Sequence, residues 1–334
     1  MKVGVVGLGA IGSLFFTRLL HFVNPLNRAL KDKQSHIYAV VKESHLASLT
    51  SVVIYDNAHP RKTLVNVPTN APPNAQAFCV DFDRPLDVLL VTVKSNQTYE
   101  VAARLKAGRA MGKDSLVISV QNGLGNVKVL KDILETDNVL HGVTYMGGTS
   151  VGPGHVLQGG HGPTIVQNAD HLSDTVQETL NDFTALLSNA GIPTQLVPSN
   201  DLQSVLWTKL VVNAGINPLG AILNVPNQEV VAGPSHHMVI QALVDEAAAV
   251  AAAQGIPLQF HGKSALEYTI DAAKATGTNI CSMCQDLRRG RATEIDAIND
   301  MVVTYGQEYG VPTPANELIV HLVKSLEQSK MTKD

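Results

Sequence analysis

The chain has 334 residues, more than one hydrophobic core usually organises, so two domains are expected. Hydrophobic residues make up 45% of the chain and charged residues 16%, a balance that excludes extensive disorder. The net charge of -4 offers no basic surface for a phosphate polymer, so we expect no nucleic-acid partner.

The first predicted elements are a strand, a tight turn and a helix. Val3–Val6 is a short β-branched run, Gly7–Gly12 follows it, and an apolar helical pattern continues through Leu20. Lys2 and this apolar run resemble a secretory signal, but the regular glycines and the lack of a small-residue cleavage site favour folded structure. The run is also shorter than the ~20 apolar residues of a membrane span. We therefore expect a cytoplasmic protein with no membrane partner.

The turn has the Gly-x-Gly-x-x-Gly spacing of dinucleotide-binding domains, between a strand and a helix, where this spacing is meaningful. Gly7 allows the tight turn, Gly9 lets the backbone approach a pyrophosphate, and Gly12 permits close helix packing. The helix N-terminus adds N–H groups and a favourable dipole for the anion. The candidate cofactor-binding residues in the turn are Gly7, Leu8, Gly9, Ala10, Ile11 and Gly12.

The end of the second predicted strand, Ile37–Val41, indicates the type of cofactor. An acidic residue there binds the ribose hydroxyls of NAD, whereas a cation suits the 2′-phosphate of NADP. Lys42 occupies this position, and Glu43 follows it, which would serve NAD if the strand ran one residue longer. We expect NADP, as NADPH, with Lys42 at its phosphate. The distance from Gly12 is unusually long, which we attribute to an insertion at Asn24–Lys33.

The remaining strands predict a Rossmann-type doubly wound α/β sheet. Leu86–Val93 and Leu116–Val120 are nearly continuous hydrophobic runs, typical of parallel strands covered on both faces. His155–Leu157 and Thr164–Gln167 are expected to be short antiparallel edge strands that close the first domain. Turn-forming residues at Pro198–Asn200 mark the boundary, so the dinucleotide-binding domain is expected at 1–197 and the second domain at 198–334.

The second domain is expected to be all α, because the hydrophobic period becomes helical after the boundary. Helices are predicted at Thr208–Leu223, Met238–Gln254, Ala265–Lys274, Ser282–Arg289, Ala292–Tyr309 and Asn316–Gln328. On the first of these, Lys209, Asn213 and Asn217 recur at i, i+4 and i+8 and share one face. Polar groups in so apolar a helix need partners if they are buried, and a ligand could supply them. A solvated helix face is the alternative.

Cysteine and histidine usage points to neither disulfides nor a metal. Cys79, Cys281 and Cys284 form no disulfide framework and suit a reducing compartment. Cys281 and Cys284 have a redox spacing, but without a thioredoxin-like context we prefer two small apolar residues one helical turn apart. The histidines, including His236 and His237, lack companion ligands at a recognisable spacing.

Five motifs follow one another along the chain, namely Val91–Gln97, Gln121–Gly125, Trp207–Asn213, Ile216–Leu219 and Thr293–Asp296. In this order they resemble the motifs of ketopantoate reductases, and the similarity runs from the first strand to about residue 300. The resemblance implies an oxidoreductase that reduces 2-dehydropantoate (ketopantoate) to pantoate with NADPH, a step of pantothenate biosynthesis.

The resemblance also implies roles for residues of the second domain. It makes Lys209 the general acid that protonates the ketone oxygen, where negative charge develops as hydride arrives. Glu294 corresponds to the carboxylate that holds the substrate and pairs with the surroundings of the lysine, although an exposed helix glutamate is the alternative. Asn213, Asn217 and Ser282 would contact the hydroxyl and carboxylate groups of the substrate.

Three further residues have implied positions. Asn122 would lie at the nicotinamide edge, and Lys94 at the mouth of the fourth strand near cofactor and substrate. Asn227 matches an asparagine near the substrate, though a turn role explains it equally well. Lys42 replaces the more usual arginine, and the Asn24–Lys33 link is longer than usual, so both departures concern the grip on the phosphate.

Alternative functions remain open from the sequence. The chain could be an NAD(P)-dependent D-2-hydroxyacid dehydrogenase that acts on another branched 2-oxo acid. A dinucleotide-sensing protein would bind NADPH without turnover and would not need Lys209, and a purely structural role predicts no cofactor affinity. The expected partner is a small-molecule 2-oxo acid, with a homodimer as an open alternative to a monomer.

Overall fold

The computed structural model describes residues 1–23, 35–41, 51–56, 62–66, 85–152 and 154–331. The chain divides into two compact units. Unit 1 consists of residues 1–121 and 126–199, and unit 2 of residues 122–125 and 200–334. The short segment 122–125 therefore groups with the C-terminal part of the chain, which no sequence pattern indicated.

Unit 1 is built on a seven-stranded sheet with the order β11-β10-β7-β6-β5-β1-β2. The strands are β1 (Lys2–Val6), β2 (His36–Val40), β5 (Leu86–Val91), β6 (Met111–Ser119), β7 (Val139–Thr144), β10 (Thr164–Asn168) and β11 (Thr194–Pro198). Strands β2, β1, β5, β6 and β7 pair in parallel, and β10 pairs antiparallel to β7. The predicted Rossmann-type doubly wound sheet is confirmed.

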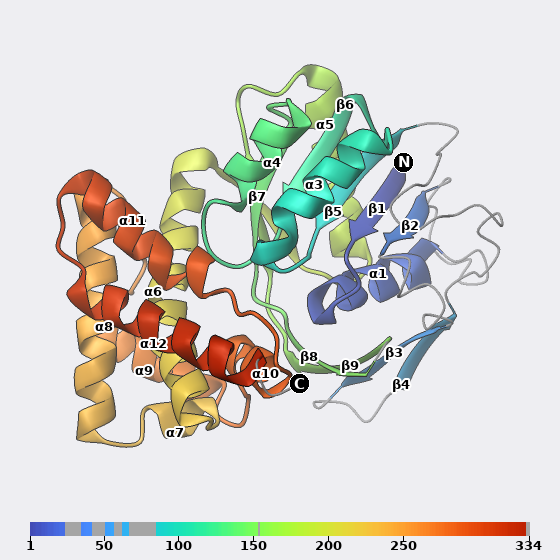
Figure 1. Cartoon of the computed structure of the whole chain (residues 1–334). Helices are drawn as coiled ribbons and strands as arrows, with labels where there is room; N and C mark the ends of the chain where they lie inside the picture. The colour runs from blue at the N-terminus through green and yellow to red at the C-terminus, as the bar shows by residue number, and fades with distance from the viewer. Residues whose placement is uncertain (24–34, 42–50, 57–61, 67–84, 153, 332–334) are drawn as a thin grey trace. The chain divides into compact units, whose positions relative to one another are not determined.

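Helices cover both faces of this sheet (Figure 1). They are α1 (Ala10–Val23), α3 (Thr98–Ala107), α4 (Asn126–Leu134) and α5 (Asp174–Asn189). Val5 packs with the cluster that contains residues of α1 and α5, whereas the next residue, Val6, packs with the cluster of α3 and α4. Successive side chains of a strand point to opposite faces, so a strand buried on both faces must be hydrophobic throughout. This explains the nearly continuous apolar runs.

A second, four-stranded sheet has the order β4-β3-β9-β8 and lies beside α1 (Figure 1). Its strands are β3 (Ser51–Asp56), β4 (Lys62–Asn66), β8 (Gly147–Gly152) and β9 (His155–Gly160). The Arg18 guanidinium of α1 donates to Gln158 Oε1 of β9 at 3.1 Å. The predicted antiparallel pairing is confirmed, since β9 pairs with β8 and β10 with β7, but the prediction that β9 and β10 are edge strands is wrong. β3 pairs with the outer side of β9, and β11 pairs with that of β10.

Unit 2 is helical, as predicted. Its helices are α6 (Ser199–Leu223), α7 (Asn227–Val230), α8 (Pro234–Ala253), α9 (Ala265–Ala275), α10 (Ser282–Arg288), the 3-10 helix η2 (Ile295–Ala297), α11 (Asn299–Tyr309) and α12 (Pro314–Met331). The single helix predicted over Ala292–Tyr309 is wrong, because α11 begins only at Asn299. The backbone N–H of Thr293 donates to Glu327 Oε1 at 2.6 Å, and the Thr293 hydroxyl accepts from the N–H of Ile295. These side-chain bonds hold the segment before η2 outside the helix.

The helix α6 passes the length and composition test for a membrane span, but 78% of its apolar window is buried. Gly215 marks its close approach to α8, because a Cβ there would lie 2.7 Å from a methyl group of Val244. Trp207 packs on the ring of Tyr305 at 5.8 Å between centroids. The apolar composition of α6 is thus accounted for by packing within the fold.

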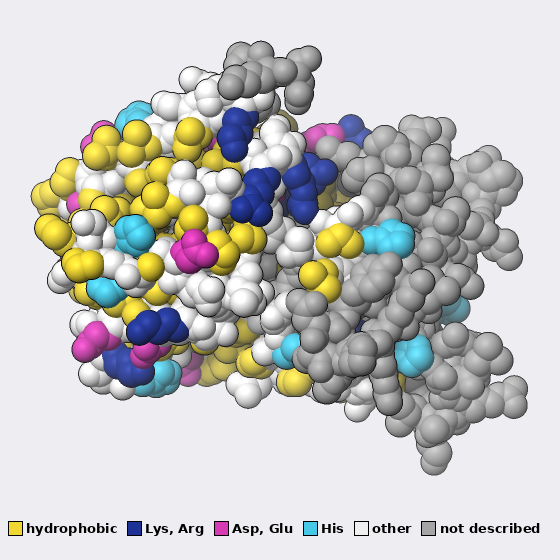
Figure 2. Space-filling view, turned by 90° about the horizontal axis from the view of Figure 1, so that it is seen from below, with side chains coloured by type: hydrophobic (Ala, Val, Ile, Leu, Met, Phe, Trp, Pro, Cys, Tyr) yellow, Lys and Arg dark blue, Asp and Glu magenta, His cyan; other side chains and the backbone are white. Residues whose placement is uncertain are grey.

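The surface of unit 2 carries exposed apolar side chains on α8 and α12. They include Met238, Val239, Leu318 and Leu322. Figure 2 shows hydrophobic side chains spread over this unit, interrupted by histidines and by charged groups of both signs. Single exposed apolar side chains of this kind are normal on a protein surface.

Candidate functional site

In the glycine turn between β1 and α1, two glycines are closely packed by other protein atoms and the third is open. Gly7 has a φ of +90°, and a Cβ there would lie 2.5 Å from Val93. A Cβ on Gly12 would overlap with the carbonyl oxygen of Gly7, so α1 can begin this close to the turn only with glycine. A Cβ on Gly9 would meet no protein atom within 4 Å, which leaves its backbone open to a ligand. These surroundings fit a pyrophosphate at the N-terminus of α1.

Neighbouring strands hold this turn in place. The Thr92 hydroxyl, just after β5, lies 2.9 Å from the carbonyl oxygen of Val6 and 2.6 Å from that of Gly7. The N–H of Gly7 donates to the carbonyl of Val40 at 2.8 Å. Thr92 was not predicted as a site residue. Its signals in the sequence were its place at the end of a buried strand and its position within the Val91–Gln97 motif.

Lys94 lies at the same carboxyl edge of the sheet as the glycine turn. β1 pairs with β2 on one side and with β5 on the other, so the strand order reverses at β1 and β5, where open α/β sheets bind ligands. Lys94 is the N-cap of the 3-10 helix η1 (Ser95–Gln97) that follows β5. Unit 1 thus brings Lys94 and Gly7–Gly12 to adjacent strand ends. Lys42, Glu43 and the Asn24–Lys33 insertion lie outside the described residues.

In unit 2, three of the predicted site residues are joined by hydrogen bonds. Lys209 Nζ on α6 donates to Asn122 Oδ1 at 3.1 Å. Asn122 Nδ2 in turn donates to Glu294 Oε2 at 3.4 Å. Glu294 is buried, with 4% of its surface exposed, and Lys209 is partly buried. The Asn122 amide therefore bridges a cation and a carboxylate.

A close backbone approach places Asn122 beside Glu294. Gly123 has a φ of +78°, and a Cβ there would overlap with the carbonyl oxygen of Ala297 in η2. The next residue, Leu124, donates its N–H to that same carbonyl at 2.9 Å. The glycine therefore permits segment 122–125 to dock on the turn that follows Glu294. The contact between Asn122 and Lys209 was not predicted from the sequence.

The surroundings of Lys209 weaken its hold on a proton. Burial lowers the pKa of Lys209 from 10.5 to about 8, and the negative charge of Glu294 opposes this shift. The ammonium is thus mostly protonated at neutral pH but releases its proton more readily than an ordinary lysine. A general acid is most effective with a pKa near the working pH, so this group suits proton donation.

Two family models match the chain, one over most of unit 1 and the other over most of unit 2. The model described as ketopantoate reductase PanE/ApbA matches residues 3–171, and that described as ketopantoate reductase PanE/ApbA C terminal matches residues 201–327. The chain belongs to the ketopantoate reductase family.

Individual relatives agree with the family models. A 2-dehydropantoate 2-reductase of Archaeoglobus fulgidus is 35% identical over 75% of this chain and 80% of its own length. That of Halobacterium salinarum is 30% identical over 97% and 98%. The crystal structure of a PanE/ApbA family ketopantoate reductase from Ralstonia eutropha superposes with a TM-score of 0.79 at 27% identity, covering 99% of both chains. A D-mandelate dehydrogenase has the same fold, with a TM-score of 0.78 at 23% identity and 99% coverage of both chains.

In this member of the ketopantoate reductase family, Asn213 and Asn217 follow Lys209 on α6, and a cysteine ties Asn217 to α10. The Cys281 thiol donates to the carbonyl of Asn217 at 3.4 Å and accepts from the N–H of Cys284, which makes it the N-cap of α10. Ser282, the first residue of α10, therefore directly follows Cys281, whose thiol contacts the backbone of Asn217. This role of Cys281 was not predicted from the sequence, because cysteine is not among the usual N-cap residues.

The two cysteines of unit 2 are buried thiols. Burial raises the pKa of Cys281 to about 12, and it also raises the pKa of Cys284. A neutral buried thiol is a poor nucleophile, so capping and packing account for this pair.

Asn227 lies at the start of α7 and is bonded to the loop that links α9 and α10. Its Nδ2 donates to the Thr276 hydroxyl at 2.9 Å, and its backbone N–H donates to the carbonyl of Asn279 at 2.9 Å. Its Oδ1 is buried and has no hydrogen-bond partner among the described residues. These contacts give Asn227 a structural role, and its contact with substrate stays a prediction.

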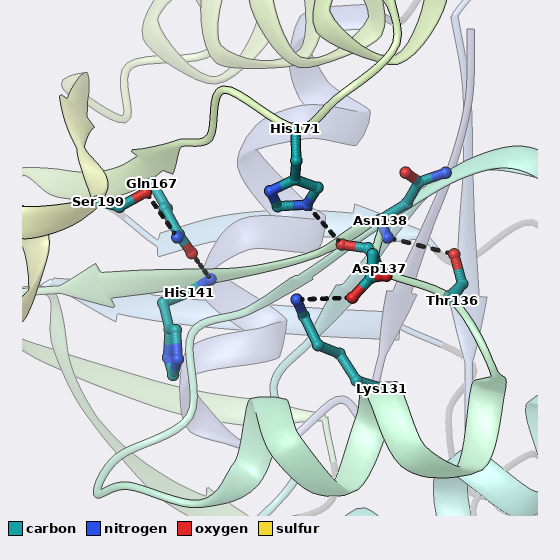
Figure 3. Close-up of polar contacts among 8 residues, drawn as sticks. All are labelled: Lys131, Thr136, Asp137, Asn138, His141, Gln167, His171 and Ser199. Atoms are coloured by element: carbon teal, nitrogen blue, oxygen red, sulfur yellow. Dashed lines mark hydrogen bonds and ion pairs between the residues drawn. The ribbon is translucent and has the colours of Figure 1, made fainter.

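A second polar cluster of unit 1 surrounds the connection from α4 to β7 (Figure 3). The side chain of Gln167 on β10 accepts from the N–H of His141 and donates to the Ser199 hydroxyl, both at 3.1 Å. Lys131 and His171 both bind Asp137. Burial, with a smaller effect of the Lys131 charge, lowers the pKa of His141 to about 4. His141 is therefore neutral at pH 7, and the cluster ties β7 to its neighbours.

Among the described residues, no group of three or more His, Cys, Asp or Glu side chains is placed to hold a metal.

Proposed function

We propose that the chain catalyses the reduction of 2-dehydropantoate to pantoate with NADPH, with Lys209 as the general acid. Membership of the ketopantoate reductase family supports the reaction. The observation that carries the chemistry is the 3.1 Å hydrogen bond between Lys209 Nζ and Asn122 Oδ1, beside the buried Glu294 carboxylate. In this arrangement one N–H of the Lys209 ammonium group is oriented by its hydrogen bond to Asn122, next to a buried carboxylate.

The cofactor is a nicotinamide dinucleotide, which supplies a hydride to the ketone carbon of the substrate when bound. The residues of the chain manage the proton and the geometry. Lys209 donates a proton from Nζ to the ketone oxygen as the carbonyl electron pair moves onto it, and the resulting amine takes a proton from water afterwards. A positioned acid of this kind contributes typically ~10²–10⁴-fold in rate. Asn122 orients the ammonium, and Glu294 keeps it protonated near neutral pH.

We assign substrate binding to four polar side chains of unit 2, namely Asn213, Asn217, Asn227 and Ser282. Amide and hydroxyl groups can donate to a carboxylate and can also pair with a hydroxyl, the two functional groups that 2-dehydropantoate presents besides its ketone. The position of Asn213 and Asn217 one and two turns after Lys209 supports this for two of them. Ser282 is supported by the contact of its neighbour Cys281 with Asn217.

The glycine turn is proposed as the site of the cofactor pyrophosphate. The open backbone at Gly9 and the N-terminus of α1 support this assignment. The finer preference for NADPH rests on Lys42 at the expected place of the 2′-phosphate, with Lys94 and Asn122 toward the nicotinamide end. No metal takes part in the proposed chemistry.

The proposed setting is the cytoplasm, with a small 2-oxo acid as partner and neither nucleic acid nor membrane. We also propose a homodimer. One solved ketopantoate reductase, from Staphylococcus aureus, is described as dimeric, which supports this proposal. Light scattering on the purified chain tests this assembly.

A substrate panel tests the proposed function. Oxidation of NADPH and of NADH is followed with ketopantoate, 2-oxoisovalerate, benzoylformate and pyruvate, and kcat/KM should be highest for ketopantoate with NADPH. A higher value for benzoylformate or 2-oxoisovalerate would instead assign a D-2-hydroxyacid dehydrogenase. NADPH binding without turnover of any 2-oxo acid would indicate a dinucleotide-sensing protein, and a lack of cofactor binding would leave only a structural role.

A further inference from the structure

The helix that carries Lys209 contains a proline next to one of the proposed substrate-binding residues. Pro218 lies inside α6, directly after Asn217. Because proline has no N–H, it cannot donate to the carbonyl four residues earlier, which is that of Ala214. Ala214 has 0% of its surface exposed, so bulk water cannot take the place of the missing donor. The helical ladder is therefore interrupted between Ala214 and Pro218, in the stretch that also carries Asn217.

Asn299 supplies a donor to this carbonyl from another helix. Its Nδ2 donates to the carbonyl oxygen of Ala214 at 3.1 Å, in a fully buried place. Asn299 is the first residue of α11 and follows η2, whose N-cap is Glu294. The short segment 294–299 thus carries the site carboxylate at one end and the donor to α6 at the other.

The orientation of Asn299 is determined by a chain of buried amides. Its Nδ2 also donates to Asn316 Oδ1 at 3.0 Å. Asn316 Nδ2 donates to the Leu243 carbonyl at 3.0 Å and to Glu246 Oε2 at 2.8 Å. Glu246 on α8 also accepts from the N–H groups of Ala315 and Asn316 in the first turn of α12. The donor to Ala214 is therefore anchored through α12 to α8.

The hydrogen bonds of Asn299 are one-sided. The Oδ1 of Asn299 is buried and has no partner among the described residues, so only the NH2 end of this side chain is used. A buried acceptor without a partner costs free energy, and an apolar residue would avoid that cost. The presence of an asparagine at this position is explained if its hydrogen bond to the Ala214 carbonyl holds α6 in place.

We propose that Asn299 is a positioning residue for the reduction. It holds the interrupted turn of α6, so that Asn213 and Asn217 keep their places relative to Lys209 and Glu294. This inference rests on the proposed function, in which these four residues serve the substrate. Because Asn299 acts through α6, its loss should change the handling of the 2-oxo acid and leave cofactor binding in unit 1 unchanged.

The kinetic test uses the full chain with Asn299→Leu, which has nearly the same shape but no donors. Expected are a rise in KM for ketopantoate together with a fall in kcat, about tenfold or more in kcat/KM, since small displacements of a site are costly. The Kd of NADPH should stay within about twofold, as the glycine turn belongs to unit 1. Rates are expressed per cofactor-binding site, which corrects for any loss of folded protein. If Asn299 has only a structural role, its replacement lowers the folded fraction alone, and KM and kcat stay at their parent values. That result would overturn the proposal.

A matched control comes from Thr269 on α9. Its side chain is fully buried against the same stretch of α6, near Gly215, and its hydroxyl has no partner among the described residues. Thr269→Val therefore alters a polar group at equal burial without removing a hydrogen bond to α6. Its KM and kcat for ketopantoate should match the parent. A loss equal to that of Asn299→Leu would mean that any change behind α6 has this effect, and would overturn the specific role of Asn299.

A thermal-stability cycle tests the contact with Ala214 without any substrate. Pro218→Ala restores an N–H that can donate to the Ala214 carbonyl, so Asn299→Leu should lower Tm by fewer degrees in this background than in the parent. Equal Tm losses in the two backgrounds would overturn the role at Ala214. If Asn299→Leu alone does not fold, folding of the double variant Asn299→Leu/Pro218→Ala supports the proposal. If neither variant folds, the essential contact of Asn299 is its hydrogen bond to Asn316, and the role at Ala214 is overturned. A parent chain that reduces no 2-oxo acid would refute the proposed function, whereas this cycle would still report on Asn299.

Discussion

Lys209 donates a 3.1 Å hydrogen bond to the side chain of Asn122, a residue 87 positions earlier in the chain. Asn122 belongs to a four-residue segment that groups with unit 2, although the chain on both sides of it belongs to unit 1. The amide of Asn122 also donates to Glu294, so the lysine and the carboxylate share one neutral bridge. The predictions on the reaction follow from this connection.

Replacement of Lys209 by alanine should remove the acid and leave the fold and NADPH affinity nearly intact. We expect a loss of ~10²–10⁴-fold in kcat, because the ammonium matters most once negative charge has built up on the ketone oxygen. The measurement is single-turnover hydride transfer at saturating NADPH and ketopantoate. Lys263→Ala, at an exposed lysine paired with Asp271 in the same unit, is the control and should be neutral.

The outcome of the Lys209 experiment has two informative alternatives. A variant that reacts within a few-fold of the parent rate would remove Lys209 from the mechanism. A rise in KM alone would make Lys209 an anchor for the substrate carboxylate, and Lys94 would then be the next candidate for the acid.

The pH dependence of kcat should report the lowered pKa of Lys209. The acid must be protonated, so kcat should fall as the pH rises through about 8. Glu294→Gln removes a negative charge that raises this pKa, and the falling limb should therefore move to lower pH, with lower turnover at neutral pH and unchanged NADPH affinity. The check is a pH–rate profile of both proteins. A limb at the same pH and unchanged steady-state kinetics would contradict the role of Glu294.

Gly123→Ala should displace Asn122 from Lys209. The added Cβ would overlap with the backbone carbonyl of Ala297, which cannot move aside as the end of a flexible side chain can. We expect about a tenfold or larger loss of kcat. Gly125→Ala is the control, since Gly125 has a similar φ of +84° but its Cβ would lie 3.6 Å from the flexible Met301 sulfur. Equal losses of kcat in the two variants would assign the effect to backbone strain alone.

Lys42→Glu should weaken NADPH binding far more than NADH binding. The 2′-phosphate would then meet a like charge in place of a charge-assisted partner. Titration of both cofactors measures the two dissociation constants, with Lys113→Glu, an exposed position of unit 1, as the control for general charge effects. Equal losses for both cofactors would remove Lys42 from the phosphate site.

The stability of the chain should fall in mild acid because of His141. Its pKa is lowered from 6.5 to about 4 in the folded protein, so between these values the unfolded chain binds a proton that the folded chain does not. The free energy of unfolding should therefore decrease as the pH falls from about 6.5 to about 4, by up to about 3 kcal/mol. Urea unfolding over this range tests it against His141→Gln, which lacks the titrating ring. Parallel pH curves for the two proteins would refute the assignment.

Local patterns were sufficient to predict the strand, glycine turn and helix at the N-terminus. Gly7, Gly9 and Gly12 stand at the spacing that such a turn requires, and neighbours in sequence are also neighbours in space there. The hydrophobic runs at Leu86–Val93 and Leu116–Val120 likewise predicted strands covered on both faces. In each case the information lies within a few residues, at the period of the element itself.

The tertiary structure alone decided which distant groups meet. Strands β9 and β10 are interior because β3 and β11 pair with them, and the helix predicted from Ala292 begins at Asn299 because Thr293 binds Glu327 across the unit. The sequence placed Lys209, Asn213 and Asn217 on one face and, through the family motifs, marked Asn122 and Glu294. Only the fold shows that Asn122 bridges Lys209 and Glu294, and that burial lowers the pKa of the lysine. Side-chain period is a local property of the backbone, whereas burial, charge proximity and a donor for the Ala214 carbonyl depend on residues that come together only on folding.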